Sequence, residues 1–168
     1  MKMKSVPLPH DLLVAFLLVQ NAMDRRSDPF FLSFGLTAAQ FNILNLLALH
    51  DGPLDQLALT ERLLVGKSSI SIVLNRMVKA ELIARQDHAK DRRQVVLILT
   101  RKGRMLWRKV SARYEQTVEE IFGAMPEGRR EAFLEDLGVL FAALKREDGA
   151  TSPSLQETLA QLAMASKA

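Results

Sequence analysis

The chain has 168 residues and a mass of 18.8 kDa, which suits one domain with extensions. Apolar residues make up 48% of the sequence, which excludes disorder throughout, and cysteine is absent, which excludes disulfides, thiolate metal sites and cysteine nucleophiles. The net charge of +4 divides unevenly: residues 1–60 carry −1, residues 61–113 carry +10, and residues 114–168 carry −5.

The first predicted element is a helix over residues 11–24, which is apolar on nearly every side. A helix of this kind must be covered from more than one direction, either inside the domain or by a second subunit. Residues 27–35 are expected to be irregular, because Asp28-Pro29 interrupts a helical pattern. The apolar run at residues 12–19 is too short to cross a bilayer, which needs about 20 residues. It also lacks the cleavage site of a secretion signal, so we expect a cytoplasmic protein with no membrane segment.

Three short helices are expected next. Thr37 and Gln40 have the spacing of a capping box at the start of the first helix, and Asp51-Gly52-Pro53 ends it. The second helix is expected over residues 55–64 and the third over residues 68–80.

The pattern then changes from helix to strand. Residues 82–85 and 95–99 are predicted to form a β-hairpin with a charged tip. Thr100 is expected to cap a long helix that reaches Gly123. The sequence therefore predicts a mainly α fold with a small β-hairpin wing (α+β), in which a winged helix-turn-helix is flanked by helices.

Pro126 is expected to start a last amphipathic helix. Residues 148–154 have the composition of a linker, and a weakly helical tail is expected over residues 155–165.

The helix at residues 68–80 has two different sides at 100° per residue. One side is apolar and is expected in the core: Ile70, Val73, Leu74, Met77 and Val78. The other side is mostly polar, with two serines at its borders: Ser68, Ser69, Ser71, Ile72, Asn75, Arg76 and Lys79. Residues 61–113, which contain this helix, carry a net charge of +10, as expected for a segment that binds a polyanion. Together with this charge, the outer side is typical of a helix that lies in the major groove of DNA.

The polar side chains suggest separate roles in DNA binding. Asn75 can pair with adenine and Arg76 with guanine, if either reaches a base edge. Ser68 and Ser69, at the helix start, can bind phosphate, and Lys79 is better suited to phosphate than to a base.

The hairpin tip carries Lys90, Asp91, Arg92 and Arg93. Residues two apart in an extended chain point the same way, so Asp91 can orient Arg93 for insertion into a minor groove. The alternative is a solvent-exposed tip with a weak surface ion pair. Ile72 likewise has two open interpretations, as a contact to a thymine methyl or as an ordinary exposed apolar residue.

Catalytic and metal sites are not indicated. Gly66-Lys67-Ser68 is similar to the end of a phosphate-binding loop, but Glu61 stands where that loop needs glycine. His10, His50 and His88 lack the spacing of metal ligands. We therefore expect no enzyme, no metal and no cofactor.

Several segments occur in a characteristic order: residues 36–41 (LTAAQF), 53–58 (PLDQLA), 67–71 (KSSIS), 91–93 (DRR) and 97–103 (LILTRKG). In this order and spacing, the chain resembles MarR-type winged-helix transcriptional regulators from about residue 36 to residue 105. The Asp-Arg-Arg wing followed by Leu-x-Leu-Thr-x-x-Gly is the most specific part.

The resemblance implies an obligate homodimer whose first and last two helices interlock with the partner's. It implies a ligand-responsive repressor that binds double-stranded DNA at an inverted repeat. The alternative is a winged-helix module that docks an acidic protein. The resemblance implies that a recognition helix carries Ser68, Ser69, Ser71, Asn75 and Arg76, and that Arg93 enters the minor groove with Asp91 orienting it. Together with the residues that the sequence itself suggests, the predicted DNA contacts are Lys67, Ser68, Ser69, Ser71, Ile72, Asn75, Arg76, Lys79, Lys90, Asp91, Arg92 and Arg93.

The resemblance also suggests a site for a small-molecule effector between the dimer helices and the winged domain. Five aromatic residues are candidates for its lining, with ordinary core packing as the alternative: Phe16, Phe30, Phe31, Phe34 and Trp107. On this basis we divide the chain into a first dimerisation segment (1–35), the DNA-binding domain (36–100), the C-terminal dimerisation helices (101–147) and a tail (148–168).

Two residues depart from the family pattern. Ile72 stands where the family usually has a polar or basic residue, so base preference is expected to be unusual. Glu81 stands where the family usually has glycine, so it must adopt an unfavourable backbone conformation or shift the turn.

Overall fold

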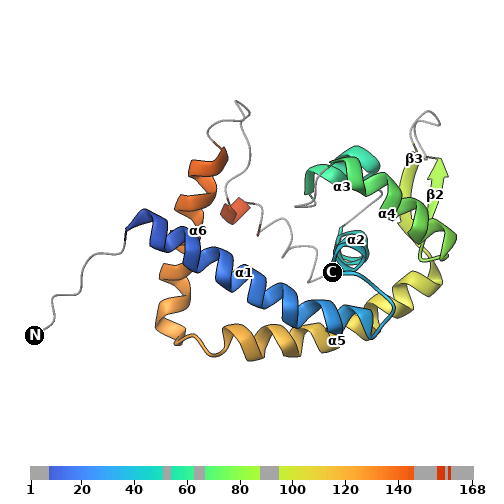
Figure 1. The fold of residues 1–168 in the computed structure, drawn as a ribbon. Helices are drawn as coiled ribbons and strands as arrows, with labels where there is room; N and C mark the ends of the chain where they lie inside the picture. Colours follow the sequence, from blue (N-terminus) through green and yellow to red (C-terminus); the bar gives the residue numbers. More distant parts are fainter. Residues whose placement is uncertain are drawn as a thin grey trace, which may run out of the picture. The chain divides into compact units, whose positions relative to one another are not determined.

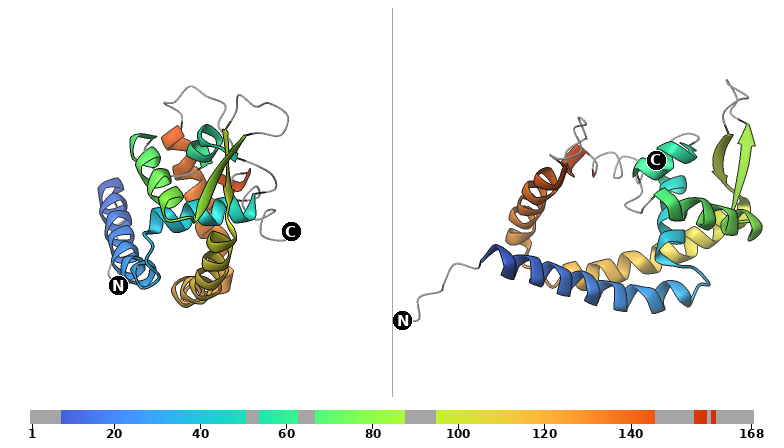
Figure 2. Two further views of the ribbon diagram at one scale, coloured as in Figure 1. Left: turned by 90° about the vertical axis from the view of Figure 1, so that its right-hand side faces the viewer. Right: turned by 45° about the horizontal axis from the view of Figure 1, so that its top comes forward.

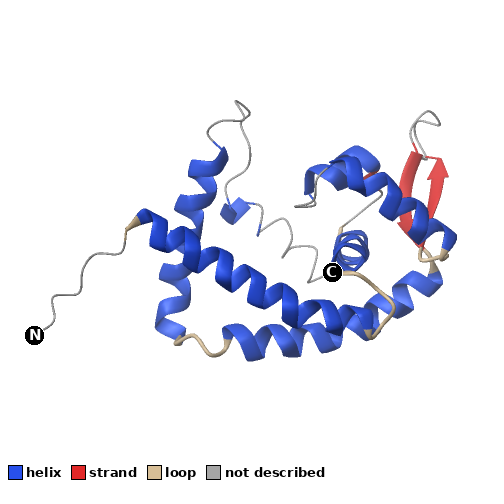
Figure 3. Ribbon diagram, viewed as in Figure 1, coloured by secondary structure: helices blue, strands red, loops and turns tan. Residues whose placement is uncertain are grey.

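The computed structural model describes residues 8–50, 54–62, 67–87, 95–145, 155–157 and 159. The described chain is mostly helical with one small sheet (Figures 1 and 3). It separates into two compact units, residues 1–41 and residues 42–168, which are described one at a time. Within the described residues, no helix has the length and apolar character needed to span a membrane.

The first unit contains α1 (Pro9–Leu32) and the first turn of α2 (Ala38–Leu49). The prediction that residues 27–35 are irregular is wrong for residues 27–32, because α1 continues through Pro29. The helical path places the ring centroids of Phe30 and Phe34 5.3 Å apart, and those of Phe30 and Phe31 5.1 Å apart. The rings therefore pack against one another directly after Pro29, where proline removes one backbone hydrogen bond of the helix.

Gly35 ends this helical stretch. Its φ of 71° lies in the left-handed region, which glycine adopts without a steric penalty. The turn lets the Leu36 amide donate to the Phe31 carbonyl at 3.1 Å. The predicted capping box of α2 then follows: the Gln40 amide donates to the Thr37 hydroxyl at 3.2 Å, and the Thr37 amide donates to Gln40 Oε1 at 2.8 Å.

The second unit contains the winged helix-turn-helix. After α2 come β1 (Leu54–Asp55), α3 (Gln56–Arg62), α4 (Lys67–Lys79), β2 (Ile83–Asp87) and β3 (Val95–Leu99). The strands form an antiparallel sheet in the order β1-β3-β2, in which Leu54 pairs with Leu97 and Ile83 pairs with Leu99. The predicted hairpin is confirmed, although its first strand begins one residue later and extends two residues further.

Strand β1 was not predicted, because two residues are too few to show a periodic pattern. Asp55, expected to be the first residue of a helix, lies in this strand instead. Its carboxylate accepts a hydrogen bond from the Ala58 amide at 2.7 Å, so it caps α3 from the strand. The helix consequently begins at Gln56.

The core of this unit is formed by apolar residues from every one of these helices. Leu44 of α2, Leu59 of α3, Leu74 and Met77 of α4, and Val110 of α5 (Arg101–Phe122) have no measurable exposure. This packing fixes α4 on its inner side and leaves its outer side free for a ligand.

Two longer helices complete the second unit, α5 (Arg101–Phe122) and α6 (Glu127–Lys145), and Figure 2 shows α6 turning away from the line of α5. Pro126 precedes α6 directly, as predicted. Of the predicted helical tail, residues 155–157 and 159 are helical, and the remainder lies outside the described residues.

Candidate nucleic-acid interface

Helix α4 has the two sides that its sequence predicts. Ile70, Leu74 and Met77 are buried, and Val73 and Val78 are half-buried. The predicted outer residues with described side chains are all exposed: Ser71, Ile72, Asn75, Arg76 and Lys79. We call these five residues the outer face of α4. Ile72, in its middle, is 57% exposed, so it is available to contact a methyl group.

Two side chains of the outer face are held by residues of neighbouring elements. Gln56 Nε2, at the start of α3, donates to the Ser71 hydroxyl at 2.8 Å. The Arg85 guanidinium, from β2, donates through Nη2 to Asn75 Oδ1 at 2.8 Å. Sequence reasoning missed Gln56 and Arg85, because their positions beside α4 depend on how α3 and β2 pack against it.

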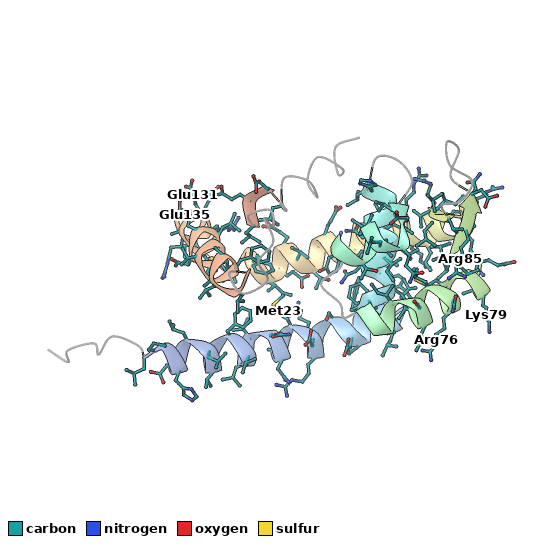
Figure 4. The ribbon with its side chains drawn as sticks, turned by 90° about the horizontal axis from the view of Figure 1, so that it is seen from above. Met23, Arg76, Lys79, Arg85, Glu131 and Glu135 are labelled. Atoms are coloured by element: carbon teal, nitrogen blue, oxygen red, sulfur yellow. The ribbon has the colours of Figure 1, made fainter. Side chains whose placement is uncertain are left out.

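Arg85 also adds a positive charge to this region. Figure 4 shows it at the same end of the winged helix-turn-helix as Arg76 and Lys79, which project from α4. All three side chains are exposed. Three cations on the outer side of a helix-turn-helix favour an anionic ligand such as a phosphate backbone.

The C-terminal end of α4 turns sharply at Glu81. This residue has a φ of 58°, so the first alternative predicted for it is confirmed: it keeps the turn and adopts the unfavourable left-handed conformation. The Leu82 amide donates back to the Met77 carbonyl at 3.0 Å, which closes the end of the helix.

A dense set of hydrogen bonds joins this turn to the start of α5. The Thr100 hydroxyl donates to the Glu81 carbonyl at 2.6 Å and accepts from the Gly103 amide at 3.0 Å, which confirms Thr100 as the N-cap. The Thr100 amide donates to the Leu82 carbonyl at 3.2 Å. Lys102 Nζ donates to the Ala80 carbonyl at 2.7 Å. The end of α4 and the start of α5 are therefore one connected structure.

Seven predicted DNA contacts lie in the wing or in the first turn of α4. The wing residues Lys90, Asp91, Arg92 and Arg93 lie outside the described residues. Lys67, Ser68 and Ser69 form the first turn of α4, and only their backbone is described.

The five aromatic residues predicted for an effector site have different environments. Phe30, Phe31 and Phe34 form a cluster of rings, and the ring of buried Phe31 stacks on Phe41 with centroids 4.9 Å apart. Phe16 is 52% exposed on α1. In the second unit, the indole Nε1 of Trp107 donates to Asn45 Oδ1 at 3.0 Å.

A separate hollow of about 410 Å³ lies in the second unit and contains none of these five residues. It is bordered by the end of α2, both strands of the hairpin and Arg104 of α5. Among the described residues, no group of three potential ligand side chains is placed to hold a metal ion.

The family model of the MarR family matches residues 34–94. The transcriptional regulator FarR of Neisseria gonorrhoeae is 27% identical over 113 residues, which cover 66% of this chain and 77% of FarR. The transcriptional repressor YetL of Bacillus subtilis (strain 168) is 23% identical over 135 residues, which cover 80% of this chain and 81% of YetL.

Solved structures share the fold. The DNA complex of MepR from S. aureus matches with a TM-score of 0.72 and 22% identity, covering 82% of this chain and 99% of MepR. The organohalide-sensing regulator RdhR, with 2,4-dichlorophenol bound, matches with a TM-score of 0.71 and 19% identity, covering 85% of each chain.

Proposed function

We propose that this chain, a DNA-binding transcriptional regulator of the MarR family, is a ligand-responsive repressor. We propose further that it binds an inverted repeat as a homodimer. The observation that carries the proposal is the outer face of α4, where Asn75, Arg76 and Lys79 are exposed beside Arg85. The opposite side of α4 is anchored in the core, so these side chains are presented on a rigid helix.

Exposed apolar side chains support the homodimer. On α1, Leu12, Leu13, Leu17 and Leu18 are between 53% and 63% exposed in the single chain. Apolar patches of this extent on a soluble protein mark surfaces that another molecule covers. A second copy would cover them and would supply a second α4. Two recognition helices read half-sites about one helical turn apart, roughly 34–36 Å.

The same pattern continues in the last helix, where Val139, Leu140 and Leu144 of α6 are 69%, 54% and 78% exposed. These are the helices that the family resemblance assigns to dimerisation. The dimer is therefore proposed to use α1 and α6 together with α5.

Repression and a response to a ligand are proposed from the relatives. YetL is named a repressor, and RdhR has been solved with a bound chlorophenol. A ligand changes DNA affinity only if it binds the DNA-competent and incompetent arrangements with different affinity. The aromatic cluster of Phe30, Phe31 and Phe34 is the candidate contact surface for such a ligand.

The test is selection of bound duplexes from a random pool, followed by titration of the selected duplex and a scrambled duplex of the same composition. We expect an inverted repeat, preferential binding to the selected duplex, and a complex mass that corresponds to two chains per duplex. Equal affinity for both duplexes would mean that the protein binds DNA only through electrostatic attraction to the phosphates, which would contradict the proposal of sequence-specific binding. Binding to an acidic protein without a preferred duplex would support the interaction module instead.

A further inference from the structure

We propose that Arg85 sets base specificity by holding the side-chain amide of Asn75 in one orientation, so that Asn75 presents its NH₂ group to the DNA and reads a purine. The inference rests on the proposed function, since it concerns how the same surface distinguishes sequences. Asn75 is the residue that touches the base, and Arg85 is a positioning residue that acts through it.

The two residues come from different elements. Asn75 is exposed on α4, and Arg85 is exposed in the middle of β2, where it pairs with Leu97 of β3. Helix α4 packs against β2, and Met77 of α4 and Ile83 of β2 are both buried. The pairing of β2 with β3 holds the backbone of Arg85, and the packing of α4 on β2 holds the backbone of Asn75. The 2.8 Å hydrogen bond therefore joins two residues whose backbones have fixed positions.

The chemistry of the pair allows only one orientation of the amide. A free asparagine side chain can rotate by 180° and exchange its donor and acceptor. A guanidinium group has five N–H donors and no acceptor, so Arg85 can bond only to the carbonyl oxygen of Asn75. The NH₂ group of Asn75 therefore remains available, and the rotated amide would place two donors against each other.

This orientation matches some base edges and opposes others. Purines present the acceptor N7 in the major groove, to which the NH₂ group of Asn75 can donate. Cytosine presents the N4 donor, which an amide reads only through its oxygen. With its oxygen engaged by Arg85, Asn75 favours a purine over cytosine. An amide released from Arg85 can read either class by rotating.

The experiment compares base preferences from random-duplex selection for the full-length parent, Asn75→Ala, Arg85→Met and the double variant. Arg85→Met keeps the length of the side chain and removes its donors. The matched control is Lys79→Met, which removes one exposed cation from the same region. Thermal unfolding of each variant verifies that the fold is retained.

We expect the parent to prefer a purine at one position of each half-site, by about tenfold over cytosine. Asn75→Ala and Arg85→Met should both lose this preference at that position, and the double variant should lose no more than Asn75→Ala alone. Lys79→Met should weaken binding to all sequences alike and lower the salt slope by about one, with base preferences unchanged.

A fifth variant gives a gain of function. Asn75→Asp replaces the NH₂ group with a second acceptor that Arg85 still orients, so the preference at that position should change from purine to cytosine. This outcome does not depend on a loss of binding, so it separates a specific role from general damage.

Three results would overturn the inference. Arg85→Met could behave like Lys79→Met, which would make Arg85 a phosphate contact. It could alter a different position from Asn75→Ala, which would mean that Arg85 reads its own base. A parent with no sequence preference would refute the proposed function itself, and this inference with it, whereas the first two results leave the proposed function standing.

Discussion

A Cβ atom on Gly103 would overlap the main-chain carbonyl oxygen of Leu82, so the first turn of α5 lies directly against the residue that follows the turn of Glu81. Gly103→Ala should therefore destabilise the fold, because neither backbone can move without breaking the hydrogen bonds of Thr100. The expected loss in the free energy of unfolding is about 1–3 kcal/mol, the cost of inserting a methyl group into packed structure. Urea denaturation measures it.

A glycine elsewhere in the chain supplies the control. A Cβ on Gly128, in α6, meets no atom within 4 Å. Gly128→Ala should leave stability unchanged or raise it by about 0.5 kcal/mol, because alanine favours the helix. Equal effects at the two glycines would show that the close approach of Gly103 to Leu82 is unimportant.

Glu81 should limit stability through its backbone conformation. Because a non-glycine residue with a positive φ is strained, Glu81→Gly should raise the free energy of unfolding by up to about 1 kcal/mol. Its ion pair with Lys102, at 3.8 Å between exposed groups, contributes little to stability, so removing it costs little. Glu81→Ala removes the same charge and keeps the strain, so a gain of equal size in that variant would contradict the explanation.

The apolar surface of α1 should control assembly. Leu17→Glu places a charge where a leucine, 53% exposed in the single chain, is proposed to become buried in the dimer. Burying the exposed half of a leucine contributes roughly 1 kcal/mol, and a buried unpaired charge costs more, so the dimer should dissociate in sedimentation experiments. Gln20→Glu adds the same charge at an exposed polar position of α1 and should leave the dimer intact. A dimeric Leu17→Glu variant would move the interface away from this surface.

The wing should contribute affinity through Arg93, which lies outside the described residues. Arg93→Ala should weaken binding to the selected duplex by about 1–3 kcal/mol, because it removes a guanidinium group proposed to bind in the minor groove, and the dimer should be unaltered. The matched control is Arg113→Ala, which removes an exposed arginine from the middle of α5. The wing assignment fails if the two variants bind the duplex with equal affinity in fluorescence anisotropy.

The features that the sequence predicted correctly depend on local spacing. The two sides of α4 follow from the 3.6-residue period, and the caps at Thr37 and Thr100 follow from side chains that reach three residues along the chain. The hairpin was likewise predicted from a local pattern, the strand-forming composition of residues 82–85 and 95–99.

The features that the sequence did not predict depend on packing between distant segments. Helix α1 passes through Pro29 against the local preference for a break, and just after it buried Phe31 stacks on Phe41, ten residues further along the chain. Arg85 reaches Asn75, and Gln56 reaches Ser71, only because the sheet and α3 lie beside α4. Their sequence separations of ten and fifteen residues follow no helical or strand period.

The hydroxyl of Thr100 has a consequence for protein engineering. Because this single group caps α5 and also donates to the carbonyl of Glu81, α4 cannot be exchanged without the start of α5. A chimaera with the DNA specificity of another regulator must transplant residues 54–103 as one block. This block includes the three paired strands, Arg85, and Gly103, which lies against the carbonyl of Leu82.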